Sequence, residues 1–158
     1  MEAARRATPA DVDALAALVT AEHHELAPQR GGALWVAAAP PASPERLLAA
    51  LADARALVLA GTIDDVVLGV AIARVVHAPG VGAVAIIDDL FVDADAREVG
   101  IGAALIAEVV TWSRDLGCVG VDATVLPGNR AAKNFFEAHG LVARAITVHR
   151  RVDASPLS

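Results

Sequence analysis

Apolar residues recur every three or four positions after Gly100, at Ile101, Leu105, Val109 and Trp112. This spacing places them on one face of a helix, and Gly117 supplies the residue that commonly ends one. The pattern therefore predicts an amphipathic helix from about residue 100 to 117.

The apolar period changes to that of strands in the middle of the chain. Residues 56–60, 66–76 and 83–92 read as three strands in hairpin order, separated by turn residues. Start signals at Thr8-Pro9 and Ser43-Pro44 predict helices over residues 9–26 and 43–54. The remaining predicted elements are a strand near residues 3–7, a strand at 119–125, a helix after Asn129 that ends near Gly140, and a last strand over 141–151.

Composition and charge exclude several classes of protein. The 158 residues are 56% hydrophobic and 20% charged, which is typical of one globular domain rather than a disordered chain. A net charge of −6 argues against a nucleic-acid binder, which needs a basic face. The single cysteine, the absence of zinc-ligand spacing and the lack of an apolar run of about 18 residues favour a cytoplasmic protein without metal, signal peptide or membrane anchor.

An apolar strand running into a glycine-rich helix start is the most informative feature of the chain. Residues 87–92 form the strand, and Arg97 precedes Gly100 and Gly102 at the helix start. The first N–H groups of a helix have no partner inside it, and the helix dipole places partial positive charge there. With two glycines, a phosphate group can approach this backbone closely. A dinucleotide-binding motif would need a third glycine at position 105, which is leucine.

Two motifs resemble the GNAT superfamily of acyl-CoA-dependent N-acetyltransferases. Arg97-x-x-Gly100-x-Gly102 is similar to the family's Arg/Gln-x-x-Gly-x-Gly/Ala signature. The segment 129–141 is similar to its Asn-x-x-Ala-x-x-x-Tyr-x-x-x-Gly-Phe helix. The resemblance, with the order of elements, implies an α/β (α+β) fold with a central mixed, mostly antiparallel sheet flanked by helices. We expect one domain over residues 1–158, with an acceptor-side part (1–55), hairpins and pyrophosphate helix (56–117) and a strand-helix-strand part (118–151).

The resemblance also implies the residues that bind acetyl-CoA, the expected cosubstrate. Backbone amides near the helix start would hold the coenzyme A pyrophosphate, and the strand edge at Leu90, Phe91 and Val92 would pair with the pantetheine arm. Asn129 would reach the pantetheine, and Ala132 would leave room for it. The residues that the resemblance assigns to pyrophosphate binding are Arg97, Glu98, Val99, Gly100, Ile101, Gly102 and Ala103.

Two departures from the family pattern bear on catalysis. Phe136 stands where the family has a tyrosine that serves as general acid, and the chain has no tyrosine at all. Phe136 would instead form a wall near the thioester. The segment 88–98 also holds five acidic residues against Arg97 alone, which places negative charge beside the expected anion site.

Asp88 and Asp89 are candidates for the general base that takes a proton from an attacking amine. Consecutive strand residues face opposite sides, so at most one of them is expected to line the cleft. Each carboxylate can equally serve as a solvated acid or a loop cap. His23 and His24, near the end of the first long helix, are candidates for binding substrate or metal, although histidine also suits a helix end for dipole reasons.

The expected function is transfer of an acetyl group to a primary amine of a small molecule by direct attack, without a covalent intermediate. A non-catalytic acyl-CoA-binding or sensor module, or a protein N-terminal or lysine acetyltransferase, are the alternatives. Net negative charge favours a cationic acceptor. A homodimer is possible.

Overall fold

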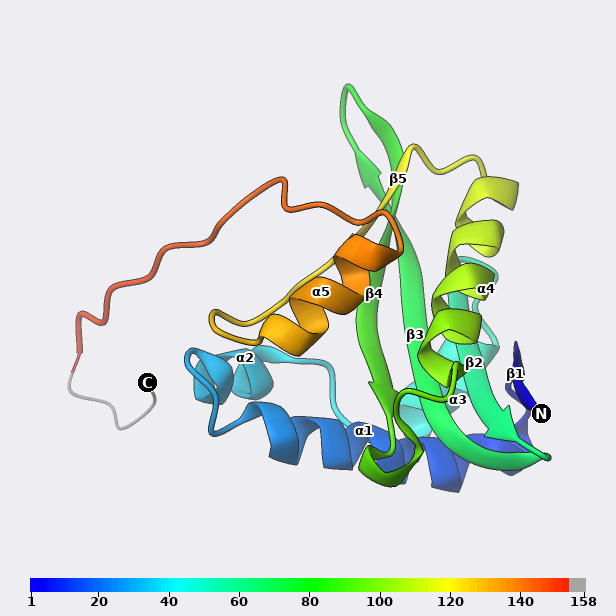
Figure 1. Ribbon diagram of the computed structural model, residues 1–158. Helices are drawn as coiled ribbons and strands as arrows, with labels where there is room; N and C mark the ends of the chain where they lie inside the picture. Colours follow the sequence, from blue (N-terminus) through cyan, green and yellow to red (C-terminus); the bar gives the residue numbers. More distant parts are fainter. Residues whose placement is uncertain (154–158) are drawn as a thin grey trace.

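A computed structural model describes residues 1–153 and shows a five-stranded sheet flanked by helices (Figure 1). The strand order is β1-β2-β3-β4-β5, with antiparallel pairs from β1 to β4 and a parallel pair between β4 and β5. The mixed, mostly antiparallel sheet that the sequence predicts is confirmed. The strands are β1 (Glu2–Arg6), β2 (Ala56–Ile63), β3 (Val66–Ala78), β4 (Gly82–Val92) and β5 (Gly120–Ala123).

The helices form where local sequence signals start and stop them. Asn129 caps α5 by accepting a hydrogen bond from the Ala132 N–H at 3.1 Å, and Ser43 caps α3 through the Arg46 N–H at 3.2 Å. The short helix α2 lies where the sequence predicted only a loop. The helices are η1 (Pro9–Asp11), α1 (Val12–Leu26), α2 (Gly32–Ala38), α3 (Pro44–Leu51), η2 (Ala94–Ala96), α4 (Ile101–Asp115) and α5 (Arg130–Ala138).

Two apolar cores lie on the two faces of the sheet. On one face α1 and α3 pack over side chains such as Val58, Val70 and Phe91. On the other face α4 packs over Leu57, Ala71 and their neighbours. Within the described part of the chain, no helix is long and apolar enough to cross a lipid bilayer.

Two glycines bring the start of α4 close to the sheet. Gly61 and Gly69 are paired across β2 and β3, and a Cβ atom on either would lie 2.5 or 2.8 Å from Cγ2 of Ile101. Real Cβ atoms do not approach that closely, so a side chain at either position would push Ile101 away. These glycines therefore fix the N-terminus of α4 against the middle of the sheet.

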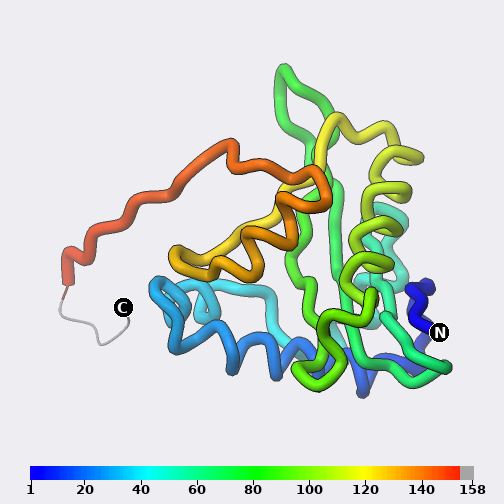
Figure 2. Tube along the Cα trace, in the orientation of Figure 1, coloured from blue at the N-terminus to red at the C-terminus, as the bar shows by residue number. Residues whose placement is uncertain are grey.

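The predicted last strand over residues 141–151 is wrong for this structure. The chain leaves α5 without strand pairing and runs away from the body as an extended arm (Figure 2). β-branched residues favour an extended backbone here, but strand formation also requires a hydrogen-bonded neighbour, which this segment lacks within residues 1–153.

Candidate functional site

One edge of β4 is free over its second half. β4 pairs with β5 only from Val84 to Ile87, because β5 ends at Ala123, whereas β4 continues to Val92. On its other side this second half remains paired with β3. Beyond Ala123 the chain bends away from β4 toward α5 (Figure 1). The backbone edge at Leu90, Phe91 and Val92 therefore has no strand partner on this side and suits an extended, amide-bearing ligand arm, except at the Val92 carbonyl, which Arg97 Nε binds.

The start of α4 follows this free edge after eight residues and has no side-chain cap. Its N-cap, Gly100, has a φ of +98°, a left-handed conformation that glycine adopts readily. The loop from Arg97 to Gly100 is exposed, as is Ala103 in the first turn. Uncapped N–H groups and the dipole of a 15-residue helix together favour an anion here.

The Arg97 side chain is already bound within the chain. Its Nε donates to the Val92 carbonyl at 3.0 Å, and its Nη2 donates to both carboxylate oxygens of Glu25 at 2.9 and 3.0 Å. Its guanidinium carbon lies 5.1 Å from the centre of the Phe91 ring. Arg97 thus joins the end of β4 to α1.

Residues of α5 lie beside the start of α4. A Cβ atom on Gly102 would meet the Phe135 ring at 3.0 Å, so any side chain there would displace that ring. Phe136 packs edge-on against Phe135, with the ring centres 5.3 Å apart, and is partly buried against the core on the α4 face. Phe136 has no group that can donate a proton.

Asn129 joins α5 to the loop before α2. In addition to capping α5, it donates from Nδ2 to the Gln29 side-chain oxygen at 3.1 Å. A cavity of about 470 Å³ lies at this junction and is lined by both residues together with Arg30, Pro127, Gly128, Arg130 and Ala131. Ala132 is half-buried in the first turn of α5.

A β-bulge at Asp88 interrupts the regular alternation of side chains along β4. Ile87 pairs with Ala73, whereas Asp89 pairs with Ile72, so Asp88 is an extra residue in the ladder. Ile87 faces the core beneath α4, and Asp89 lies on the face covered by α1 and α3. The simple alternation of faces on which the expectation for Asp88 and Asp89 rested does not apply at a bulge, where two residues oppose one on β3.

Each of these two aspartates is paired with an arginine. Asp88 accepts a hydrogen bond from Arg74 Nε at 2.8 Å, and Asp89 accepts one from Arg46 Nη2 at 2.6 Å. The Asp89 side chain is 3% exposed, and that of Arg46 is 14% exposed. Two of the five acidic charges that the sequence places before the anion site are therefore neutralised locally.

Asp89 is part of a buried polar cluster with Glu22, His23 and Arg46. His23 Nε2 lies 4.0 Å from Asp89 Oδ1, and its side chain is 16% exposed, so it links the cluster to the surface. Burial, followed by the Asp89 charge, raises the pKa of Glu22 to about 9. As a carboxylate Glu22 leaves Oε2 without a donor, whereas in its protonated form it can donate to Asp89.

The raised pKa of Glu22 predicts a pH dependence of folding. Its ordinary pKa is 4.5, so between about pH 4.5 and 9 the folded chain holds a proton that the unfolded chain releases. The free energy of unfolding should therefore fall as pH rises through this range. Glu22→Gln keeps a donor toward Asp89 and removes the titration, so its chemical denaturation curves should depend less on pH than those of the wild type. An unchanged pH slope would contradict the assignment.

Sequence reasoning missed Glu22, Arg46 and Glu25 as parts of the site. A signal for Glu22 was present, because it continues the buried α1 positions Leu15, Leu18 and Val19 at helical spacing. A carboxylate on an apolar stripe is unusual unless it is partnered or protonated. Arg46 had no comparable signal, because its contact with Asp89 joins positions 43 residues apart.

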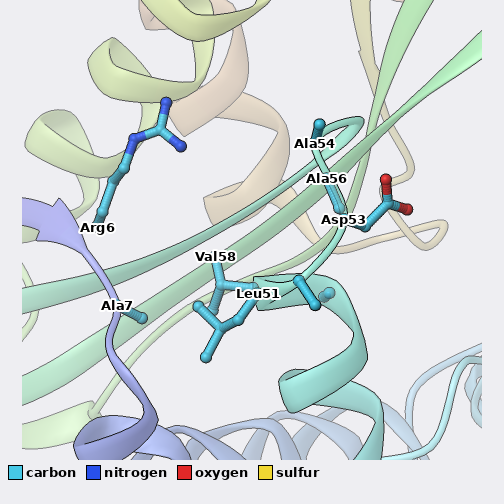
Figure 3. Close-up of a pocket in the computed structure, with 9 residues that line it drawn as sticks. Arg6, Ala7, Leu51, Asp53, Ala54, Ala56 and Val58 are labelled. Carbon is cyan, nitrogen blue, oxygen red and sulfur yellow. The ribbon is translucent and has the colours of Figure 1, made fainter.

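A second cavity, of about 300 Å³, lies at the other side of the sheet. It is formed by the end of β1, the end of α3 and the start of β2, and Leu51 and Val58 lie between Arg6 and Asp53 (Figure 3). Its lining contains none of the predicted site residues. Among residues 1–153, no group of three or more histidine, cysteine or acidic side chains is arranged to hold a metal ion.

Comparisons with known proteins agree with this geometry. The model of the acetyltransferase (GNAT) family matches residues 20–141. The BH1408 protein from Bacillus halodurans, solved as a tetramutant, has 22% identity and a TM-score of 0.80, with 94% of this chain and 99% of that one covered. No curated protein matches the sequence significantly.

Two aminoglycoside-related structures share the fold at lower similarity. AAC(6')-Iy, in complex with the bisubstrate analogue CoA-S-monomethyl-acetylneamine, has 20% identity and a TM-score of 0.72, with 96% and 99% of the two chains covered. The aminoglycoside acetyltransferase meta-AAC0020, from an uncultured soil metagenomic sample, has 20% identity and a TM-score of 0.72, with 98% and 97% covered.

Proposed function

Because the chain belongs to the acetyltransferase (GNAT) family, we propose that it transfers an acetyl group from acetyl-CoA to a primary amine of a small molecule. The observation that carries this proposal is the free edge of β4, followed directly by the uncapped start of α4. A ligand that combines a pyrophosphate with an amide-bearing arm needs both features side by side. Acetyl-CoA is such a ligand, and it supplies the thioester that the amine attacks.

The cofactor residues are those that the sequence indicated. Backbone N–H groups from Arg97 to Ala103 would bind the pyrophosphate, and the edge from Leu90 to Val92 would bind the pantetheine amides. Asn129 and Ala132, at the start of α5, would flank the same arm, with Phe136 as an apolar wall. Because Arg97 is held by Glu25, the main-chain groups rather than its side chain provide the principal contacts.

The proposed general base is His23, held in place by Asp89. Asp89 is buried and fixed by Arg46, and its second oxygen lies 4.0 Å from Nε2 of the imidazole, so the carboxylate is placed to orient the ring. A cationic amine would pass one proton to His23. The neutral amine nitrogen then attacks the thioester carbon, the C–S bond breaks, and coenzyme A leaves as a thiolate. The second proton, still on the acylated nitrogen, passes through solvent to the thiolate. Asp88 is the less suitable candidate because Arg74 binds it near the surface.

Replacing His23 by glutamine should lower kcat by about 10²- to 10⁴-fold, the usual contribution of a general base. The matched control is His24→Gln, the next residue on α1, whose side chain is exposed. Steady-state rates across pH 6 to 9 provide the measurement. Only His23→Gln is expected to remove the part of the pH–rate profile that reports the general base. Equal rates in both variants would contradict the role of His23.

Turnover tests the function as a whole. Acetyl-CoA is incubated with a panel of polyamines, aminoglycosides, amino acids and peptides, and the released thiol is measured. Acetylation of a cationic small molecule supports the proposal, and acetylation of peptides alone would favour a protein acetyltransferase. The absence of tyrosine at position 136 favours a second candidate, a non-catalytic acyl-CoA-binding module. Tight binding with no transfer to any acceptor would establish that candidate instead.

A further inference from the structure

The position of α4 sets the direction in which the pantetheine arm would run along β4. Ile101, the first residue of α4, lies over Gly69, which pairs with Val92 near the end of β4. A pyrophosphate bound at the start of α4 would therefore lie level with Val92. From there the arm would follow the free edge toward Leu90, and its thioester would lie near the bulge at Asp88. Beyond the bulge the edge is closed, because β4 is paired with β5 there.

The Leu90 backbone presents its groups to this free edge. The Asp93 N–H donates to the Leu68 carbonyl of β3 at 2.8 Å. Successive residues of an antiparallel strand alternate between the two sides, so the groups of Val92 and Leu90 point away from β3. The Val92 carbonyl accordingly accepts a hydrogen bond from Arg97 Nε. The Leu90 N–H is thus the edge donor nearest to the expected thioester.

The carboxyl group of Glu22 faces this Leu90 N–H from α1. Glu22 is 8% exposed, and its Oε2 is buried without a hydrogen-bond partner among residues 1–153. Burial and the Asp89 charge raise the pKa of Glu22 and outweigh the Leu90 N–H and the Arg46 charge, which lower it. With a pKa of about 9, the carboxyl is protonated at neutral pH. A buried acid with a proton to give therefore lies beside the place where the arm would end.

We propose that Glu22 is the general acid that protonates the sulfur of coenzyme A as the thioester breaks, an inference that rests on the proposed acetyl transfer. The S–H bond forms while the O–H bond of Glu22 and the C–S bond break. The Glu22 carboxylate then regains a proton from solvent, which takes up the second proton of the acylated nitrogen. A bound arm that engages the Leu90 N–H removes one of the interactions that favour the carboxylate, so cofactor binding keeps Glu22 protonated.

The chemistry of Glu22 suits this step better than that of its neighbours. A thiol such as that of cysteine has a pKa of about 8.5, and proton transfer is efficient when the pKa values of donor and acceptor are close. Asp89 is unsuitable because its carboxylate is paired with Arg46. Phe136, the expected wall near the thioester, has no proton to donate. Glu22 and the proposed base His23 are adjacent on α1, and both face Asp89.

Glu22→Gln should lower kcat at least about 100-fold and leave the KM for acetyl-CoA close to that of the wild type. The wild-type kcat should fall as the pH rises through about 9, because Glu22 then loses its proton, and this fall should be absent in Glu22→Gln. The other charged groups facing Glu22 are Asp89 and Arg46, which pair with each other, and His23, whose role as base affects the acid side of the profile. Steady-state rates from about pH 6 to 10 provide the measurement.

The matched control is Glu108→Gln, which removes an exposed acid on α4 and should keep both the rate and its alkaline fall. Thermal unfolding verifies that each variant is folded. Phe136→Tyr adds a hydroxyl at the expected wall of the thioester, and it should raise the kcat of Glu22→Gln by at least about tenfold but that of the wild type far less. An equal increase in the two backgrounds would count against the acid role.

Two further outcomes separate this inference from the proposed function. If Glu22→Gln keeps the wild-type kcat, or loses rate but retains the alkaline fall, Glu22 is not the acid, and acetyl transfer itself stands. If the wild type transfers no acetyl group to any amine, the proposed function fails and this inference fails with it.

Discussion

Replacing Ala103 by glutamate is expected to lower the affinity for acetyl-CoA at least about 100-fold while leaving the fold as stable as before. Ala103 is the third residue of α4 and is exposed. Glutamate at this position folds back toward the N-cap N–H and interacts favourably with the helix dipole, so the helix itself gains stability. The same carboxylate occupies the expected anion site. Two like charges about 4 Å apart near a protein surface repel by about 4 kcal/mol, and about 1.4 kcal/mol corresponds to a factor of ten in affinity.

Ala107→Glu is the matched control, because it places the same side chain on exposed helix surface one turn further along α4. Calorimetric titration with acetyl-CoA at low ionic strength, together with thermal unfolding, measures both effects. Gly102→Asp is the less suitable variant, because its side chain would displace Phe135. A loss of affinity in that variant could not be separated from a loss of stability. Full affinity in Ala103→Glu would refute the placement of the pyrophosphate.

Arg46→Leu is expected to destabilise the fold by about 3 to 5 kcal/mol. Arg46 is the cation that pairs with Asp89 in the buried cluster, and its loss leaves a carboxylate without a counter-charge in the interior. Arg74→Leu removes the equivalent contact to Asp88, but that arginine side chain is 50% exposed, so the cost should stay below about 1 kcal/mol. Chemical denaturation at pH 7 measures the difference.

The double variant Arg46→Leu, Asp89→Leu separates charge from packing. Removing both partners of a buried pair is often close to neutral, so this variant should regain most of the lost stability. If Arg46→Leu costs no more than Arg74→Leu, the cluster is not the buried ion pair described above.

The sequence predicted the local elements well, because their signals are local. Ser43 and Asn129 cap the helices that the sequence assigned to them, and the three central strands lie within a few residues of their predicted bounds. These signals depend on hydrogen bonds three residues apart or on an apolar period, both of which can be read from a short window.

The features that the sequence could not predict depend on distant contacts. The bulge at Asp88 is a property of the pairing with β3, and it interrupts the alternation of faces along β4. The contacts of Arg46 with Asp89 and of Arg97 with Glu25 join residues 43 and 72 positions apart. The course of the chain after α5 is likewise set by contacts outside a short window, because residues 141–153 have the pattern of a strand but no strand partner within residues 1–153. The assignment of the cofactor-binding residues and of the general base remains a prediction.

The ion pair between Arg97 and Glu25 would couple the binding of coenzyme A to the binding of the acceptor. A pyrophosphate that attracts Arg97 must compete with Glu25, which lies two residues after His23 on α1. Where coenzyme A draws Arg97 away in this manner, a carboxylate is freed on the helix that carries the proposed base. By thermodynamic reciprocity, a cationic acceptor that takes up Glu25 would release Arg97 and strengthen the hold on the nucleotide. Each substrate would then raise the affinity of the protein for the other.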